Sequence, residues 1–159
     1  NNVTIKLISN SKLKNYEMAI ECYDAVLQIF PNDLSALVNK ISSLRKQGNL
    51  EKALNMCDEI LKNNSKYNIA LYHKERILFS LDKFDDSISC CNRILDDYPN
   101  NGDVLFDKSC NLAMLSKLDQ ALDILQHAIS QNVKYKSKAK KSKSFEKLFH
   151  NITFEKLTT

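Results

Sequence analysis

Apolar residues recur along this chain at helical spacing, and the pattern itself repeats every 34 residues. Between residues 50 and 61 the apolar side chains follow the i, i+3, i+4, i+7 spacing that gathers them on one face of an α-helix. A small residue recurs once per period, and a large apolar residue precedes it by three positions. These two columns are Ala19, Ala53, Ser87 and Ala121, and Tyr16, Leu50, Phe84 and Leu118. The agreement of several columns on one period indicates tandem structural repeats.

The period predicts four helix pairs, and the turn-forming residues fall between the predicted helices. Gly48 separates the two helices of one pair, whereas Pro31 and Pro99 separate neighbouring pairs. Asp33 and Asn101 are placed to cap the helices that follow them. The predicted helices are residues 2–13, 16–30, 34–47, 50–63, 68–81, 84–97, 102–115 and 118–132. An isolated pair cannot bury its apolar face, so we expect the pairs to stack into an all-α solenoid.

Strings within these columns resemble the tetratricopeptide repeat family, in the variant whose first helix reads Asn-Lys-Gly and whose second reads Glu-Ala-Leu. The matching strings are Leu37-Val38-Asn39-Lys40-Ile41, Leu50-Glu51-Lys52-Ala53-Leu54, Tyr72-His73-Lys74-Glu75, Phe106-Asp107-Lys108-Ser109 and Leu118-Asp119-Gln120-Ala121-Leu122. The resemblance covers residues 1–133. It implies a right-handed α-solenoid of four helix-turn-helix repeats, at about 1–33, 34–67, 68–101 and 102–135, with a capping helix after them. At the family's small position in the first helix stands Glu75, which needs a partner or a route to solvent if it is buried.

The resemblance also implies a binding site, because arrays of this family bind peptides or other proteins in a concave groove lined by the first helix of each pair. The groove residues that it implies here are Val38, Asn39, Ser42, Arg45, Tyr72, His73, Arg76, Phe79, Asp103, Phe106, Asp107 and Cys110, extended by Thr4, Ile5 and Ile8. Aromatic and Arg side chains suit such a surface, since they offer large contact area with a polar end. The alternative is that Tyr72 and Phe106 only fill gaps between helices.

The five cysteines favour a reducing compartment and a structural role. No Cys-x-x-Cys pair occurs, and the N-terminus shows no signal-peptide pattern, so reduced thiols in the cytoplasm are the simplest interpretation. Cys57 and Cys91 share an apolar column, and Cys22 and Cys90 share the next one, so we expect these thiols to be packed in the core. Cys110 falls on the predicted groove and is the thiol expected to be reactive.

The sequence lacks the motifs of an enzyme or a metal site. It contains no glycine-rich phosphate loop, no Gly-x-Ser-x-Gly and no His-Glu-x-x-His, and its three histidines are not clustered. No apolar run approaches the eighteen residues that indicate a membrane span. We therefore expect a non-enzymatic interaction scaffold without cofactor or metal.

The C-terminal segment 134–159 differs from the repeats in charge. It holds eight Lys and two Glu, whereas residues 1–133 carry a net charge of −2 within the overall +4. One hypothesis is a capping helix near 134–143 followed by Phe-rich turns that fold back onto the last repeat. The other is a basic patch for nucleic acid or another anionic polymer, and the two can coexist. The outer face of the first helix leaves self-association as a third possibility.

Overall fold

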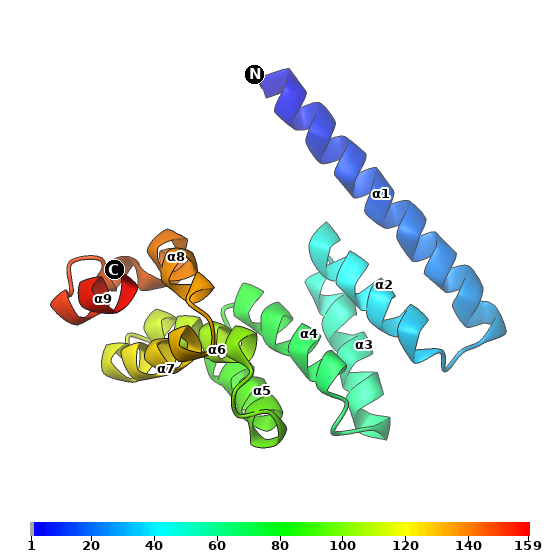
Figure 1. Ribbon diagram of the computed structural model, residues 1–159. Helices are drawn as coiled ribbons and strands as arrows, with labels where there is room; N and C mark the ends of the chain where they lie inside the picture. The colour runs from blue at the N-terminus through cyan, green and yellow to red at the C-terminus, as the bar shows by residue number, and fades with distance from the viewer. Residues whose placement is uncertain (1) are drawn as a thin grey trace. The chain divides into compact units, whose positions relative to one another are not determined.

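The computed structural model describes residues 2–159, and the side chains of residues 13–159, and it is helical throughout (Figure 1). No strand occurs between residues 2 and 159. The helices are α1 (Asn2–Ile29), α2 (Leu34–Gln47), α3 (Leu50–Asn63), α4 (Asn68–Ser80), α5 (Phe84–Asp97), α6 (Gly102–Met114), α7 (Leu118–Gln131), α8 (Lys134–Lys141), the 3-10 helix η1 (Lys143–Leu148) and α9 (Ile152–Thr158). The fold is the all-α solenoid of stacked helix pairs that the period predicts.

The chain divides into two compact units, Asn1–His73 and Lys74–Thr159, which are described separately. The first unit contains α1 to α3 and the start of α4, and the second contains the end of α4 and everything after it. In the first unit α2 packs against α1 and α3, and in the second α6 packs against α5 and α7. The short connections α2–α3, α4–α5 and α6–α7 make the two helices of each of these pairs antiparallel neighbours.

Three of the four pairs turn at the same repeat position through a residue with left-handed backbone. Gly48 has φ 91°, Asp82 has φ 57° and Ser116 has φ 59°. In each case the next residue donates its N–H to a carbonyl five positions earlier, as Asn49 does to Leu44 at 2.9 Å. This is the hydrogen bond of a Schellman motif, which ends a helix cleanly and sends the chain back.

The first pair lacks this turn, and the predicted break between 2–13 and 16–30 is wrong. The helix α1 runs without interruption from Asn2 to Ile29. The residue at the turn position is Lys14, one or two periods before Gly48 and Asp82. A lysine has no short polar group to stabilise left-handed backbone and its Cβ opposes it, so the helix continues.

The helix starts that depend on capping agree with the prediction. The Asp33 carboxylate accepts a hydrogen bond from the N–H of Ala36 at 2.7 Å, and the Asn101 side chain accepts one from the N–H of Val104 at 3.2 Å. Both side-chain oxygens satisfy N–H groups that the first helical turn leaves without partners. The starts of α2 and α6 are thus fixed by local hydrogen bonds.

The C-terminal segment closes the second unit, as the capping hypothesis expects. The aromatic side chains of Tyr135, Phe145 and Phe154 are all buried and join the core formed by α6 and α7. The lysines of α8 are mostly exposed, while Tyr135 and Ala139 are buried. The apolar residues of this segment therefore cover part of the second unit's core.

The cysteines follow their predicted columns with one exception. Cys57, Cys90 and Cys91 are buried, whereas Cys22 is exposed, so its assignment to the core is wrong. The reason is the missing turn in α1, which leaves residues 16–29 without the antiparallel partner that covers α3, α5 and α7. Within the described part of the chain, no helix has the length and apolar character that crossing a bilayer requires.

Candidate functional site

In the first unit the predicted groove residues lie on α2 and at the start of α4. Val38 is buried, Asn39 is exposed, and Ser42 and Arg45 are half-buried. On α4, Tyr72 and His73 are half-buried, with ring centroids 6.1 Å apart in an edge-on arrangement. Val38 therefore acts as a packing residue, and the others leave part of their surface in contact with solvent. The predicted extension Thr4, Ile5 and Ile8 lies outside the described side chains.

Arg45 adds a polar feature to this surface. Its Nε atom is buried and has no hydrogen-bond partner among the described residues. A buried donor without an acceptor destabilises the fold by about 1–3 kcal/mol.

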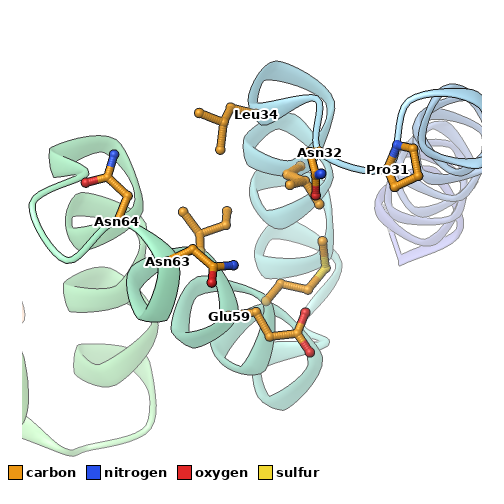
Figure 2. Close-up of a pocket in the computed structure, with 9 residues that line it drawn as sticks. Pro31, Asn32, Leu34, Glu59, Asn63 and Asn64 are labelled. Atoms are coloured by element: carbon orange, nitrogen blue, oxygen red, sulfur yellow. The ribbon is translucent and has the colours of Figure 1, made fainter.

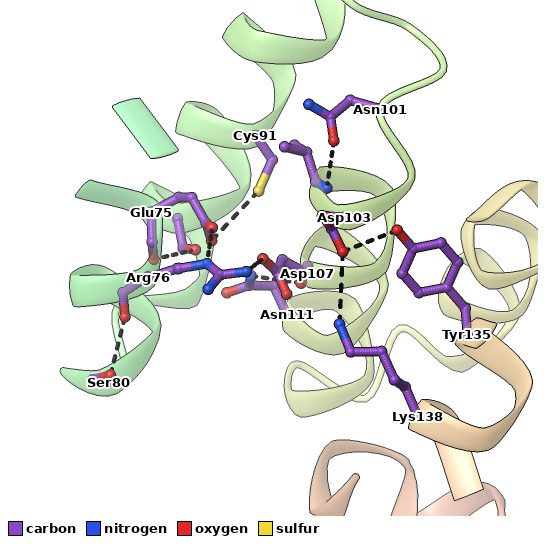
Figure 3. Close-up of polar contacts among 12 residues, drawn as sticks. Glu75, Arg76, Ser80, Cys91, Asn101, Asp103, Asp107, Asn111, Tyr135 and Lys138 are labelled. Atoms are coloured by element: carbon purple, nitrogen blue, oxygen red, sulfur yellow. Dashed lines mark hydrogen bonds and ion pairs between the residues drawn. The ribbon is translucent and has the colours of Figure 1, made fainter. Parts of the chain in front are cut away.

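In the second unit Arg76 is held between two carboxyl groups (Figure 3). Its Nη2 donates to the Oδ2 of Asp107 at 2.9 Å, and its Nε lies 3.4 Å from Oε1 of Glu75. The predicted groove residue Phe79 is half-buried and packs edge-on against Phe84, with centroids 5.5 Å apart. Arg76 and Phe79 are therefore already engaged by their own unit.

Glu75 is fully buried and behaves as a neutral acid. Burial, followed by the negative charge of Asp107, raises the pKa of Glu75 to about 9, against the opposing effect of Arg76. Its Oε1 has no hydrogen-bond partner among the described residues, and Cys91 lies 3.9 Å from its Oε2. The burial of Glu75 is thus compensated in two ways: the Arg76 guanidinium lies beside its carboxyl group, and the carboxyl group keeps its proton.

The face of α6 on which the sequence predicted a groove is covered by the chain's own C-terminal segment. The Phe106 ring stacks on Tyr135 with centroids 5.5 Å apart and meets Phe145 edge-on at 5.9 Å. Phe106 and Cys110 are each 6% exposed. Neither is available to an outside ligand in this arrangement. Sequence reasoning missed this because the 34-residue register places residues on helices but does not show where a non-repeat segment docks.

Cys110 is also not the reactive thiol that its position on the groove predicted. Burial raises its pKa to about 12, reinforced by the charge of Asp107, and its Sγ lies 3.9 Å from the Ser142 hydroxyl. A thiol that stays protonated at neutral pH is a weak nucleophile. Among the described cysteines, Cys22 is the exposed one.

Asp103 anchors α8 through charge. It accepts a hydrogen bond from the Tyr135 hydroxyl at 2.9 Å and lies 3.7 Å from the Nζ atom of Lys138 (Figure 3). The Nζ atom of Lys134 lies 3.5 Å from the same carboxylate. Burial acts to raise the pKa of Asp103, but the Tyr135 hydrogen bond and the two lysines outweigh it and hold the pKa below its usual value. Lys138 also lies 4.9 Å from the Phe106 ring centroid.

A separate pocket of about 470 Å³ lies between the start of α2 and the end of α3 (Figure 2). It is lined by Pro31, Asn32, Leu34, Leu37, Met56, Glu59, Ile60, Asn63 and Asn64. None of the predicted groove residues belongs to it. Glu59 is its one ionisable residue. Among the side chains of residues 13–159, no three His, Cys, Asp or Glu are grouped to hold a metal ion.

Comparison with known proteins agrees with this architecture. The family model described as anaphase-promoting complex, cyclosome, subunit 3 matches residues 12–94, just over half of the chain. MamA from Desulfovibrio magneticus RS-1 superposes with a TM-score of 0.75 at 15% identity, over 96% of this chain and 86% of that one. A thermophilic TPR protein of Thermus thermophilus gives 0.73 at 15% identity, over 99% and 83%.

A tetratricopeptide repeat protein from Parabacteroides merdae ATCC 43184 gives a TM-score of 0.71 at 18% identity, over 98% of this chain and 61% of that one. At these identities the likeness establishes the fold alone. No curated protein matches the sequence. Together with the 34-residue period, the matched family model places the chain in the family of anaphase-promoting complex, cyclosome, subunit 3, with the fold of a tetratricopeptide repeat protein.

Proposed function

We propose that this protein is a non-enzymatic interaction scaffold that binds a helix or extended segment of another protein on the groove face of α2 and α4. The observation that carries the proposal is the docking of α8 on α6. There, one segment of this chain already occupies the equivalent face of another repeat through an aromatic stack and a Lys–Asp pair. The same face on α2 carries Asn39, Ser42 and Arg45, which retain solvent-accessible surface.

The chemistry of this face favours a partner segment that brings hydrogen-bond acceptors. Arg45 offers a donor whose Nε lacks an acceptor among the described residues. Tyr72 and His73 add aromatic area on α4, and aromatic residues are frequent among those that dominate the energetics of interfaces. A segment with a carboxylate or a backbone carbonyl opposite Arg45, and an apolar residue opposite Tyr72, satisfies both. The family's name, a subunit of a complex, supports a role in binding other chains.

The test uses a displayed library of random peptides selected on the full chain. Enriched peptides are measured against wild type, Arg45→Ala, Tyr72→Ala and the control Tyr98→Ala, whose ring is 56% exposed outside the predicted groove. We expect each groove variant to weaken binding about tenfold and the control to leave it unchanged. Equal affinity for wild type and both groove variants would overturn the assignment. Phe106→Ala is unsuitable here, because Phe106 is part of the core.

A second candidate function is binding of an anionic polymer by the basic face of the C-terminal segment. Lys140, Lys141 and Lys143 are exposed there, whereas Lys134 and Lys138 are paired with Asp103. Binding of generic duplex DNA that weakens steeply with salt, and is lost in Lys140→Ala/Lys141→Ala, would support it. DNA binding unaffected by that double variant would exclude this surface.

A further inference from the structure

The pocket between the start of α2 and the end of α3 combines an apolar floor with a polar rim (Figure 2). Ile60 is buried there, and Leu37 and Met56 are half-buried. The rim consists of exposed side chains that carry oxygen atoms, namely Asn32, Glu59, Asn63 and Asn64. A volume of about 470 Å³ lies within the range of binding pockets. The pocket therefore suits a group that is apolar along its length and polar at its end.

The polar rim is rich in acceptors that the protein itself leaves unused. Glu59 supplies two carboxylate oxygens, and the three asparagines supply one amide oxygen each. Within the part of the chain that the structure describes, these four side chains make no hydrogen bond or ion pair. The lining contains no Lys, Arg or His. The rim thus offers several acceptor oxygens around one negative charge and has no cation of its own.

The helix ends at the pocket add to its preference for a positive charge. Ile60 and Asn63 lie in the last turn of α3, where the helix dipole is negative. The positive end of α2 also adjoins the pocket, but the Asp33 carboxylate caps it by accepting from the N–H of Ala36. Lys62 is exposed and does not line the pocket. The charges at the rim therefore favour a cationic ligand.

The equivalent positions in the second unit show how a donor can join the two sides of such a rim. Asn100 and His127 stand two periods after Asn32 and Glu59. Nε2 of His127 lies 3.1 Å from Oδ1 of Asn100, and the imidazole is the donor because an amide oxygen only accepts. In the first unit this position carries a carboxylate, which accepts as well. The first unit thus lacks the ring N–H that joins these positions in the second.

We propose that this pocket receives an arginine side chain of a partner protein. A guanidinium has five N–H donors in one plane, so it pairs with both oxygens of Glu59 and also donates to amide oxygens of the rim, whereas a lysine has three donors. The aliphatic stem covers Met56 and Ile60. The lining holds no cation for the carboxylate of free arginine, so the arginine belongs to a polypeptide. None of the predicted groove residues takes part.

Titration of the full chain with N-acetyl-arginine N-methylamide, followed in two-dimensional proton–nitrogen NMR spectra, tests the site. We expect a Kd on the order of 1–10 mM, with shifts concentrated in residues 31–37 and 56–64. The citrulline analogue keeps the stem without the charge and should bind at least about fivefold more weakly. Absence of shifts at about 50 mM, or equal binding of the two compounds, would overturn the proposal. Tighter binding of free arginine or of the lysine analogue would overturn the assigned ligand.

Variants at Glu59 locate the effect. Glu59→Gln should remove the difference between the arginine and citrulline compounds, and Glu59→His, which introduces the residue of the second unit, should weaken arginine binding at least about fivefold. The control Glu51→Gln removes an exposed carboxylate of α3 outside the pocket and should bind like wild type. Circular dichroism checks that helix content is unchanged. Undiminished binding by Glu59→Gln, or an equal loss in Glu51→Gln, would contradict the site.

The groove variant Arg45→Ala separates this pocket from the groove proposed on α2 and α4. Arg45 does not line the pocket, so the variant should keep the arginine affinity of wild type even where it loses the selected peptides. A parallel loss of both ligands in Arg45→Ala would show that they share one surface, and the separate arginine pocket would be wrong.

Discussion

The first and last helices of this chain differ in how far their apolar side chains are covered. At the C-terminal end, segment 134–159 buries Tyr135, Phe145 and Phe154 against α6 and α7, so the last repeat's apolar face meets its own chain. At the N-terminal end, α1 leaves Met18 and Ile29 exposed. Among the described residues, segment 134–159 thus covers the apolar face of α6 and α7, whereas no segment covers this face of α1. The difference teaches that charge alone does not show which face is exposed, because the lysine-rich segment is the one that covers the core.

The largest loss of stability should come from removing an aromatic ring from the core that segment 134–159 covers. Phe145 is fully buried between Phe106 and Phe154, with ring centroids 5.9 Å and 5.7 Å away. Phe145→Ala leaves a cavity there and should lower the free energy of unfolding by about 3–5 kcal/mol. The matched control is Phe30→Ala, since Phe30 is 62% exposed near the open end and should change stability by less than about 0.5 kcal/mol. Urea denaturation followed by circular dichroism measures both free energies of unfolding. Similar losses for the two variants would contradict the expected difference between the two regions.

Glu75, in the second unit, should make the free energy of unfolding depend on pH. Folded Glu75 keeps its proton up to about pH 9, whereas an ordinary glutamate loses it near 4.5. Between these values the unfolded state binds fewer protons, so the free energy of unfolding falls as pH rises. Glu75→Gln stays neutral and should remove this fall, with a gain over wild type on the order of 2 kcal/mol at pH 9. Denaturation curves at pH 5, 7 and 9 measure it, with Glu59→Gln as the exposed control.

Parallel pH profiles for wild type and Glu75→Gln would show that the buried carboxyl is ionised in the folded state. The charge of Arg76 would then outweigh burial, and the second unit would hold a buried ion pair in place of a neutral acid.

The position that starts the first helix of a pair offers a smaller and more local test. Gly102 begins α6, and a Cβ built there would lie 2.8 Å from the Tyr135 ring. Gly102→Ala should therefore displace Tyr135 and destabilise the second unit by about 1–3 kcal/mol. The equivalent residue at the open end is Leu34, which is 41% exposed, so Leu34→Ala should cost less than about 1 kcal/mol. Thermal unfolding compares the two, and a neutral Gly102→Ala would show that α8 docks loosely.

The smallest effect should come from the hydroxyl of Tyr135. Tyr135→Phe keeps the stack on Phe106 and removes the 2.9 Å hydrogen bond to Asp103. The expected loss is about 1 kcal/mol, because Lys134 and Lys138 still compensate the Asp103 charge. Urea denaturation at pH 7 measures it. A loss as large as that of Phe145→Ala would mean that polar contacts, rather than apolar burial, close this end.

The sequence predicted those helices whose boundaries are marked by local chemistry. Residues 34–47, 50–63 and 84–97 match α2, α3 and α5, because Asp33, Gly48 and Pro99 give caps, turns and stops that act over a few residues. The break near Lys14 failed because the period was extended to a repeat whose turn position lacks a turn-forming residue. The sequence already differs at this position, because the other three repeats carry Gly48, Asp82 and Ser116 where the first carries Lys14.

The sequence predicted which helices carry the candidate site residues, but not whether those residues are exposed. The register places Arg45, Tyr72 and Phe106 correctly on first helices, because side-chain direction follows from spacing. It does not tell that Phe106 is covered while Arg45 is not, since the docking of Tyr135 depends on contacts with a segment outside the repeat pattern. The binding role of these residues stays a prediction.

The residue at one position of each repeat, 14, 48, 82 or 116, stands where the chain either turns back or continues as a helix. Forcing a lysine into left-handed backbone costs about 1–2 kcal/mol relative to the helix, and about 1.4 kcal/mol corresponds to a tenfold change in population. A single substitution at position 14 therefore shifts the balance between a straight α1 and a folded hairpin by roughly an order of magnitude. A difference of one residue at one repeat position thus separates the three repeats that form hairpins from the one that forms the single helix α1.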